Sequence, residues 1–235
     1  MNLRRNALAE ILSVTTAICL LSLVMTNYCS SIPEAQATVL VNTVDSKGSA
    51  VNIGNGMYVT AFHVIEDNVK QGIPIVKLTN DQGDQVPAII RFSKPENDIA
   101  VLFTLDEYFT KQMFVNCDTL PVGAKVLTIG NPYYFNFLEF EGNISGKKFK
   151  WSYWPEVYPV AGTIIPGMSG GALVDDTGRL AGVNIGYQPF TIDESFLGGR
   201  DQSYINISFA VPTDVVCKMM TGEIDFNVYQ ILAKK

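Results

Sequence analysis

Two apolar runs on either side of a turn, within residues 73–92, decide the fold class of this chain. The stretch contains Ile73-Pro74-Ile75-Val76-Lys77-Leu78, then Asn80-Asp81-Gln82-Gly83, then Val86-Pro87-Ala88-Ile89-Ile90-Arg91-Phe92. Short runs rich in Ile and Val are typical of β-strands, and Asn, Asp and Gly are typical of the turn between two of them. The stretch therefore predicts two neighbouring β-strands.

The same succession of short apolar runs and turns continues through most of the 235 residues. Runs of this kind occupy residues 38–43, 57–60, 99–103, 125–129, 138–141, 171–174, 180–185 and 205–211. A break at Pro121-Val122-Gly123 divides them, which predicts an all-β protein of two tandem units at 38–120 and 121–222, with a tail at 223–235. The one helix that the sequence predicts covers 215–220, because Pro212-Thr213-Asp214 precedes it and Gly222 follows it.

The composition narrows the possible functions. Hydrophobic residues make up 47% of the chain and charged residues 17%, which is too apolar for a disordered chain and too polar for a multispanning membrane protein. The net charge of −6 gives no attraction to a phosphate backbone, so no nucleic-acid partner is expected. With one histidine and no paired-cysteine motif, the chain lacks an obvious ligand set, and no metal or other cofactor is expected.

Residues 1–31 have the pattern of an export signal. Arg4 and Arg5 precede the apolar residues 11–25, a stretch long enough for a signal-peptide core and short for a transmembrane helix. Small residues at 29–31 and 35–37 offer two imperfect cleavage sites, so an uncleaved membrane anchor through residues 11–25 stays open. In either case the rest of the chain is predicted to be exported, as a periplasmic, secreted or membrane-anchored protein facing away from the cytoplasm.

Cys117 and Cys217 are the two of the four cysteines that lie deep in the sequence. An exported protein can join such a pair in a disulfide, and two small buried thiols are an equally common arrangement. Their spacing leaves both interpretations open.

Three residues have the chemistry of a hydrolase. His63, the only histidine, follows an apolar run at the point where a strand should end, which suits a general base near neutral pH. Ser169 lies within Gly167-Met168-Ser169-Gly170-Gly171, where glycines can free the hydroxyl and direct backbone amides to one point. Asp98 precedes the run at 99–103 and can orient an imidazole. Taken singly, each residue also has an ordinary structural explanation.

Taken together, in the order His, Asp, Ser and with their flanking residues, these three resemble the catalytic triad of trypsin-like serine proteases, specifically the HtrA (Deg) branch. The supporting motifs are Gly48-Ser49-Ala50-Val51, Ile129-Gly130-Asn131-Pro132, Gly142-Asn143-Ile144-Ser145 and Ser208-Phe209-Ala210-Val211-Pro212. The resemblance covers residues 39–217. It implies two six-stranded antiparallel β-barrels of the chymotrypsin-like type, with the active site between them.

The resemblance also implies a mechanism and a set of site residues. Ser169 would attack the peptide bond, His63 would take its proton, Asp98 would orient the imidazole, and the Gly167 and Ser169 amides would form the oxyanion hole. The walls of the primary pocket would be Thr163, Ile164, Ile165, Val183, Asn184, Ile185, Phe209 and Ala210. None of these is acidic, so we expect a serine endopeptidase that cleaves protein or peptide substrates after small or medium apolar residues. An extended substrate would pair with the strand at 183–186.

Some features depart from the family pattern or compete with it. Met168 stands where the family often has Asn, and the chain ends soon after the second barrel, so no PDZ domain is expected. The connection from Tyr187 to Ser203 predicts a lid or substrate wall, or an ordinary exposed loop. Asp176-Thr177-Gly178 matches an aspartic-protease motif but occurs once, which favours a hairpin turn. The alternative function is a catalytically silent binding or scaffold module, and the oligomeric state is not defined by the sequence.

Overall fold

A computed structural model describes residues 37–152, 154–193, 202–225 and 227–228 of the chain. The predicted export signal at residues 1–31 lies outside these ranges, so the choice between signal peptide and anchor stays a prediction. Within the described ranges, no helix combines the length and the apolar character needed to cross a bilayer.

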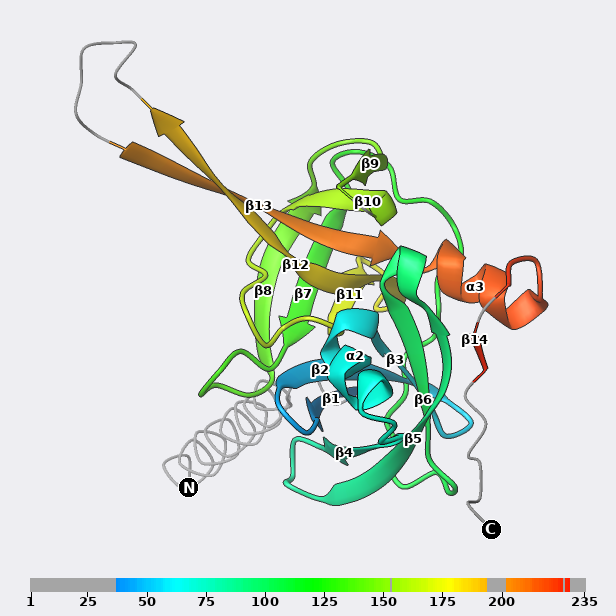
Figure 1. The fold of residues 1–235 in the computed structure, drawn as a ribbon. Coiled ribbons are helices and arrows are strands. Elements are labelled where there is room, and N and C mark those ends of the chain that lie inside the picture. Colours follow the sequence, from blue (N-terminus) through cyan, green and yellow to red (C-terminus); the bar gives the residue numbers. More distant parts are fainter. Residues whose placement is uncertain (1–36, 153, 194–201, 226, 229–235) are drawn as a thin grey trace, which may run out of the picture. The chain divides into compact units, whose positions relative to one another are not determined.

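Six strands of the first half close into a barrel (Figure 1). They are β1 (Thr38–Asn42), β2 (Lys47–Gly54), β3 (Met57–Ala61), β4 (Ile75–Thr79), β5 (Gln85–Lys94) and β6 (Ile99–Phe103). Their order is β5-β4-β1-β2-β3-β6, and pairing of β5 with β6 closes the ring. The short strand β14 (Asn227–Val228) returns from the end of the chain and adds to β5 outside the ring.

Six strands of the second half form a second closed ring. They are β7 (Lys125–Gly130), β8 (Leu138–Ile144), β10 (Trp154–Ala161), β11 (Ala172–Asp175), β12 (Leu180–Asp193) and β13 (Gln202–Pro212). Their order is β13-β12-β11-β7-β8-β10, closed by pairing of β10 with β13, and β9 (Phe149–Trp151) adds to β10. The predicted all-β class and its two six-stranded antiparallel barrels are therefore confirmed.

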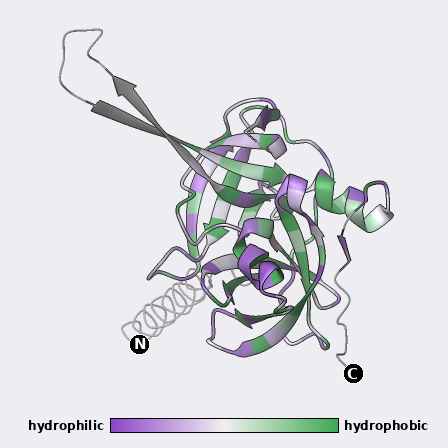
Figure 2. Ribbon diagram, viewed as in Figure 1, coloured by the Kyte–Doolittle hydropathy of each residue, from purple (hydrophilic) through white to green (hydrophobic). Residues whose placement is uncertain are grey.

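The alternation of the sequence explains how the strands bury their apolar side chains. In β4, Val76 and Leu78 are buried while Ile75 and Lys77 are exposed, as a strand with one face on the core requires. Figure 2 shows hydrophobic segments along the strands of both barrels. One buried cluster contains Tyr58 and Leu102 of the first barrel together with Phe209 of the second, so the barrels share part of their core.

The predicted C-terminal helix is confirmed as α3 (Asp214–Thr221), which ends at Gly222 in the left-handed conformation. The expectation of a single helix was wrong, because α2 (Phe62–Lys70) and the short 3-10 helix η2 (Pro95–Asn97) are also present. In α2, Val64, Ile65 and Asn68 share one buried face, and this helical spacing extends for only nine residues.

The expected lid or loop from Tyr187 to Ser203 is replaced at both ends by strands. β12 continues to Asp193 and β13 begins at Gln202, and the two pair along their length. In Figure 1 this antiparallel hairpin projects beyond the rest of the second barrel. Residues 194–201 lie outside the described ranges.

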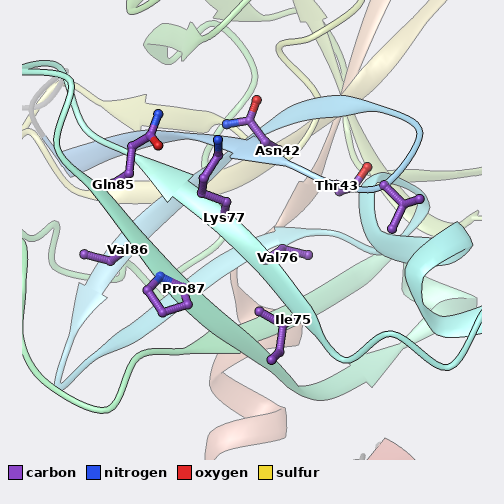
Figure 3. Close-up of a pocket in the computed structure, with 9 residues that line it drawn as sticks. Asn42, Thr43, Ile75, Val76, Lys77, Gln85, Val86 and Pro87 are labelled. Carbon is purple, nitrogen blue, oxygen red and sulfur yellow. The ribbon is translucent and has the colours of Figure 1, made fainter.

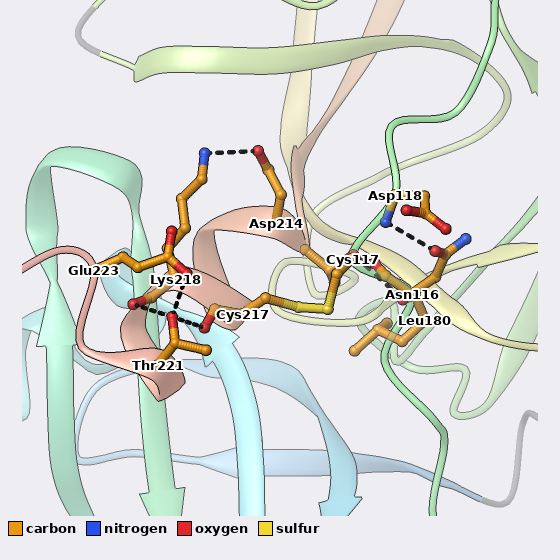
Figure 4. The surroundings of a disulfide bond; sticks show 10 residues. Asn116, Cys117, Asp118, Leu180, Asp214, Cys217, Lys218, Thr221 and Glu223 are labelled. Carbon is orange, nitrogen blue, oxygen red and sulfur yellow. Dashed lines mark hydrogen bonds and ion pairs between the residues drawn. A yellow bond between two sulfur atoms is a disulfide. The ribbon is translucent and has the colours of Figure 1, made fainter.

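Cys117 and Cys217 form a disulfide, which decides the question that their spacing left open (Figure 4). Cys117 belongs to the segment between the barrels and Cys217 to α3. The bond joins residues 100 positions apart in the sequence and has a Cα–Cα distance of 6.0 Å. It therefore ties the connecting segment to the last helix.

Candidate active site

Strand register brings His63 and Asp98 together. β3 pairs antiparallel with β6, and the last pair of the ladder is Ala61 with Ile99. The next residues along each chain, Phe62 and Asp98, therefore lie opposite each other, and Phe62 N donates to Asp98 O at 3.0 Å. α2 begins at this point, so His63 lies in its first turn directly beside Asp98.

The Asp98 carboxylate is surrounded by three hydrogen-bond donors. Its Oδ2 is 2.7 Å from His63 Nδ1, and its Oδ1 accepts from the backbone N–H of His63 at 2.8 Å. The third donor is Trp154 Nε1 of β10, at 3.2 Å from Oδ2. Asp98 has φ of 55°, a left-handed conformation that Asp tolerates better than most residues. The carboxylate is thus fixed by its own backbone and by both barrels.

The two side chains differ in their access to solvent. The Asp98 side chain is 4% exposed and the His63 side chain 38% exposed. The buried carboxylate holds Nδ1, and within the described residues the other ring nitrogen, Nε2, has no hydrogen-bond partner. This is the arrangement that a general base requires, with its proton-accepting nitrogen available to a reactant.

Glycines position Ser169 at the junction of the barrels. Gly170 has φ of 83°, and a Cβ there would collide with Ser49 O and Thr60 Oγ1 of the first barrel. Ser49 N donates to Ser169 O at 2.8 Å, and Gly170 N donates to Asn184 O at 2.7 Å. The serine loop is therefore pressed against the strand that leads into His63, an approach that only glycine permits.

The amides predicted for the oxyanion hole are not used in the described part of the chain. Neither Gly167 N nor Ser169 N donates a hydrogen bond there. Gly167 has φ of 95°, and its carbonyl accepts from Ser49 Oγ at 2.9 Å. Ser49 Oγ in turn accepts from Asn131 N at 2.9 Å and from Asn131 Nδ2 at 3.1 Å. A buried network thus fixes the peptide plane beside the two free amides.

The Ser169 hydroxyl donates to Ile185 O at 3.3 Å. Within the described residues it forms no hydrogen bond with His63. A rotation about its Cα–Cβ bond changes this partner without moving the backbone. Catalytic hydrogen bonds are often long in enzymes without substrate and shorten when substrate binds.

The eight residues predicted to wall the primary pocket are mostly buried. Five are at most 1% exposed, namely Ile164, Val183, Asn184, Phe209 and Ala210. Ile185 is also buried, Thr163 is half-buried and Ile165 is exposed. The strand pairing of β12 with β13 brings Asn184 opposite Ala210, so residues from two predicted walls do meet.

The sequence did not predict the roles of two residues near the site, Trp154 and Ser49. Trp154 donates to Asp98 and also packs near Phe209, with ring centroids 6.4 Å apart. Ser49 holds Gly167 and Ser169 from the first barrel. Ser49 stood within a motif that the sequence did identify, whereas nothing in the sequence around Trp154 links it to Asp98.

Met168, the departure from the family pattern, is fully buried against Gly130. A Cβ on Gly130 would be 2.8 Å from Met168 Cα, so this packing requires glycine there. The Met168 side chain is thus directed into the protein. No group of acidic, histidine or cysteine side chains in the described ranges is arranged to hold a metal ion.

The single aspartic-protease-like motif forms a hairpin turn between β11 and β12. Gly178 N donates to Asp175 O at 3.0 Å, and the Asp175 carboxylate accepts from Thr177 N and Arg179 N at 2.9 and 3.0 Å. Burial acts to raise the pKa of Asp175, but hydrogen bonds from Thr177, Arg179 and Asn116 outweigh it and lower the pKa. Asp175 therefore remains ionised as a structural carboxylate.

A family model and individual related proteins both place this chain among the serine proteases. Residues 48–183 match the family model described as a trypsin-like peptidase domain. A probable periplasmic serine endoprotease DegP-like from Chlamydia pneumoniae is 32% identical over 162 residues, which cover 68% of this chain and 30% of that protein. The corresponding protein of Pseudomonas savastanoi pv. phaseolicola is 27% identical over 176 residues, covering 73% of this chain and 34% of that protein.

Solved structures agree with this result. The HtrA-type protease AlgW with tripeptide has a TM-score of 0.63 and 28% identity, over 81% of this chain and 61% of that one. The similarity to this protease therefore includes both the fold and the amino-acid sequence. The chain spans about a third of the length of the curated relatives that it matches.

Proposed function

We propose that this chain, which belongs to the trypsin-like peptidase family and to its HtrA branch, hydrolyses peptide bonds through an acyl-enzyme formed on Ser169. The observation that carries the proposal is the His63–Asp98 pair, with its 2.7 Å hydrogen bond, a buried Asp98 carboxylate and a His63 side chain that is 38% exposed. A histidine with a purely structural role would not require a buried carboxylate beside a partly exposed imidazole.

In the proposed mechanism, Ser169 Oγ attacks the substrate carbonyl while His63 Nε2 accepts the hydroxyl proton. Asp98 holds Nδ1–H, which fixes the ring tautomer and stabilises the imidazolium that forms. The carbonyl oxygen becomes an oxyanion bound by the Gly167 and Ser169 amides, both of which are free of other partners in the described structure. His63 then gives the proton to the leaving amine, and water hydrolyses the ester.

Trp154 has a positioning role in this mechanism. Its indole N–H shares Asp98 Oδ2 with His63 Nδ1, so the carboxylate cannot rotate without losing two bonds. Because Trp154 comes from the second barrel, it also makes the orientation of the base depend on the barrel that carries the nucleophile.

We also propose that the enzyme prefers substrates with a small or medium apolar residue immediately before the scissile bond. The predicted walls contain no acidic residue to pair with Lys or Arg. Phe209, one of these walls, is an apolar side chain that stacks on Trp151 with ring centroids 5.6 Å apart. At Val183 the strand β12 is paired on both sides, with β11 and with β13, so it is not an edge there. An extended substrate would therefore pair with β12 beyond Val183, where the pairing with β11 has ended.

We also propose that the protein acts outside the cytoplasm. Its first 31 residues have the composition of an export signal, its described part contains a disulfide, and the Chlamydia and Pseudomonas relatives are named as periplasmic. Disulfides persist in oxidising compartments, which agrees with this location.

One observation favours a second candidate, a catalytically silent binding module. The Ser169 hydroxyl is directed to Ile185 O and not to His63. In such a protein this bond would persist, and the hydroxyl would never become nucleophilic.

A fluorophosphonate probe distinguishes the two candidates, because it reacts covalently only with an activated serine. We expect labelling of the folded protein at Ser169, its loss in His63→Ala, and its loss in Ser169→Ala. Ser145→Ala, at a serine of the second barrel far along the chain from the glycine loop, is the matched control and should label fully. Absence of labelling in correctly folded wild-type protein would establish the silent module.

A further inference from the structure

We infer that the leaving-group side of this site contains a groove for apolar side chains of the substrate segment that follows the scissile bond. The inference rests on the proposed function, because it assigns this groove to the substrate of the same site. The groove has a volume of about 580 Å³ and includes Gly167 in its lining. One wall is the turn at residues 42–47, and the other contains Tyr133, Tyr134 and Pro166. The groove is therefore continuous with the proposed oxyanion hole.

The turn at residues 42–47 shows on which side of the scissile bond the groove lies. Ser46 Oγ donates to Val64 O at 3.3 Å, and Val44 N donates to Asn68 Oδ1 at 3.2 Å. Val64 and Asn68 belong to α2, the helix whose first turn carries His63. In the proposed mechanism His63 gives its proton to the departing amine. The groove beside this helix is thus where the downstream part of a substrate leaves the site.

The groove continues onto the outer face of the first barrel. A second hollow of about 460 Å³ shares Asn42, Thr43 and Val44 with the first and extends across β4 and β5. Figure 3 shows Ile75 of β4 and Pro87 of β5 among the side chains that line this hollow. Val44 is 48% exposed and Ile75 53% exposed. Together the two hollows form an apolar path long enough for several residues of an extended chain.

The opposite wall is an aromatic loop that is exposed yet fixed. Tyr133, Tyr134 and Phe135 are 67%, 95% and 63% exposed. The φ angles of Tyr133 and Phe137 are 35° and 59°, a region that is unfavourable for bulky residues and is found most often at ligand-binding and switch regions. Phe137 N donates to Asn131 Oδ1 at 3.0 Å. Aromatic rings held outward in this way are suited to contact apolar side chains.

Both walls are formed before any substrate binds. Thr43 N and Thr43 Oγ1 donate to Ser46 O at 3.0 and 2.9 Å, so the turn is closed by its own hydrogen bonds. The aromatic loop is anchored through Asn131 to Ser49, the residue that also holds Gly167. A preformed groove loses little entropy on binding, so apolar contacts within it contribute directly to affinity.

The charges around the groove give no preference for an acidic or a basic occupant. The first hollow contains one acidic residue, Asp45, and one basic residue, Lys47. The second adds Lys77 at its polar edge. In the turn wall only Val44 is apolar, whereas the opposite wall is aromatic and the second hollow adds aliphatic side chains. With charges of both signs at the rim, these apolar side chains favour an apolar peptide segment as the occupant.

The test compares three substrates that share the same residues before the scissile bond. The first carries Phe and Leu at the second and third positions after the bond, the second carries Gly and Ser there, and the third is a p-nitroanilide with no downstream chain. We expect wild-type kcat/KM to be about tenfold higher for the first peptide than for the second. In Tyr134→Ala, kcat/KM for the apolar peptide relative to the p-nitroanilide should fall by about tenfold. Phe114→Ala, an exposed aromatic that lines neither hollow, should leave that ratio unchanged.

Equal kcat/KM for the two peptides in wild type would overturn the inference. So would an equal loss on all three substrates in Tyr134→Ala, because the loop would then act through the oxyanion hole. Failure of the proposed function has a different signature, namely no fluorophosphonate labelling and no hydrolysis of any substrate by wild type. In that case, fluorescence anisotropy of the apolar peptide with Ser169→Ala protein still decides, since adding Tyr134→Ala must weaken its binding about tenfold or the groove is not its site.

Discussion

Asp98 in the first barrel and Asp175 in the second are both buried carboxylates with several hydrogen-bond donors, but their donors differ. Asp175 is held mainly by amides of its own turn and by Asn116, none of which titrates near neutral pH. Asp98 is held by an imidazole and by an indole from the other barrel. Burial and hydrogen bonding are thus common to both, and the partner that can carry a proton distinguishes a catalytic from a structural carboxylate.

The largest expected effect follows from Asp98→Asn. The amide can no longer fix the imidazole tautomer, so kcat should fall by about 10⁴-fold while the folded structure is kept. Steady-state kinetics and circular dichroism measure the two properties. Asp67→Asn, an exposed position on α2, is the control and should retain full kcat. Comparable activity in both variants would remove the distinction drawn between Asp98 and other carboxylates.

Breaking the disulfide should lower the stability of the protein, because the bond lies next to the residue that holds Asp175. Cys117 follows Asn116, which donates to Asp175 Oδ2 at 2.7 Å. Replacing both cysteines with serine releases a loop of about 100 residues and should lower the free energy of unfolding by about 3–5 kcal/mol. Urea unfolding of the variant and of the reduced wild type measures the loss. An unchanged midpoint in both would show that the bond adds no stability.

Asp175→Asn should lower stability by about 2 kcal/mol and leave kcat unchanged, the opposite of Asp98→Asn. The pKa of Asp175 is lowered on folding, so its stabilising effect is complete above about pH 3.9, the ordinary Asp value, and is lost as the pH falls through the lower pKa of the folded protein. Thermal unfolding from pH 7 to pH 2 should therefore show wild type and variant converging at the acidic end. A constant difference across this range would contradict the assignment.

The smallest expected effect is that of Trp154→Phe, which keeps an aromatic ring, smaller than the indole, and removes the donor to Asp98. We expect kcat to fall about tenfold with KM near the wild-type value, because the residue orients the base and does not contact substrate. Trp151→Phe alters the same aromatic cluster beside Phe209 and is the matched control. If KM rose and kcat stayed constant, Trp154 would act by binding substrate and not by orienting Asp98.

The sequence predicted the strands whose apolar residues alternate or run together, and it missed those with unusual residues. β2 contains Gly48, where a Cβ would be 2.6 Å from Val64 Cγ1, so close packing between elements decides the residue there. β10 contains Pro155 and Pro159, which normally argue against a strand. Both strands form because neighbouring strands supply partners, and this information is tertiary.

For the site, residue order and flanking motifs were sufficient to identify His63, Asp98 and Ser169 as candidates. Their hydrogen bonds were not predictable, because a bond such as Trp154 to Asp98 joins residues 56 positions apart on different barrels. The groove was also beyond the sequence. Its walls come from the turn at 42–47 and the loop at 133–137, which become neighbours only after both barrels have closed.

The disulfide has a topological consequence for a protein that would meet proteases, including copies of itself. Because it joins positions 117 and 217, every peptide bond of the second barrel up to α3 lies inside one covalent ring. A single cut in the exposed aromatic loop at 133–137 would therefore open the ring without releasing a fragment. The two pieces of the cut chain would stay linked by the disulfide. The piece that contains Ser169 would therefore remain covalently bound to the piece that contains His63.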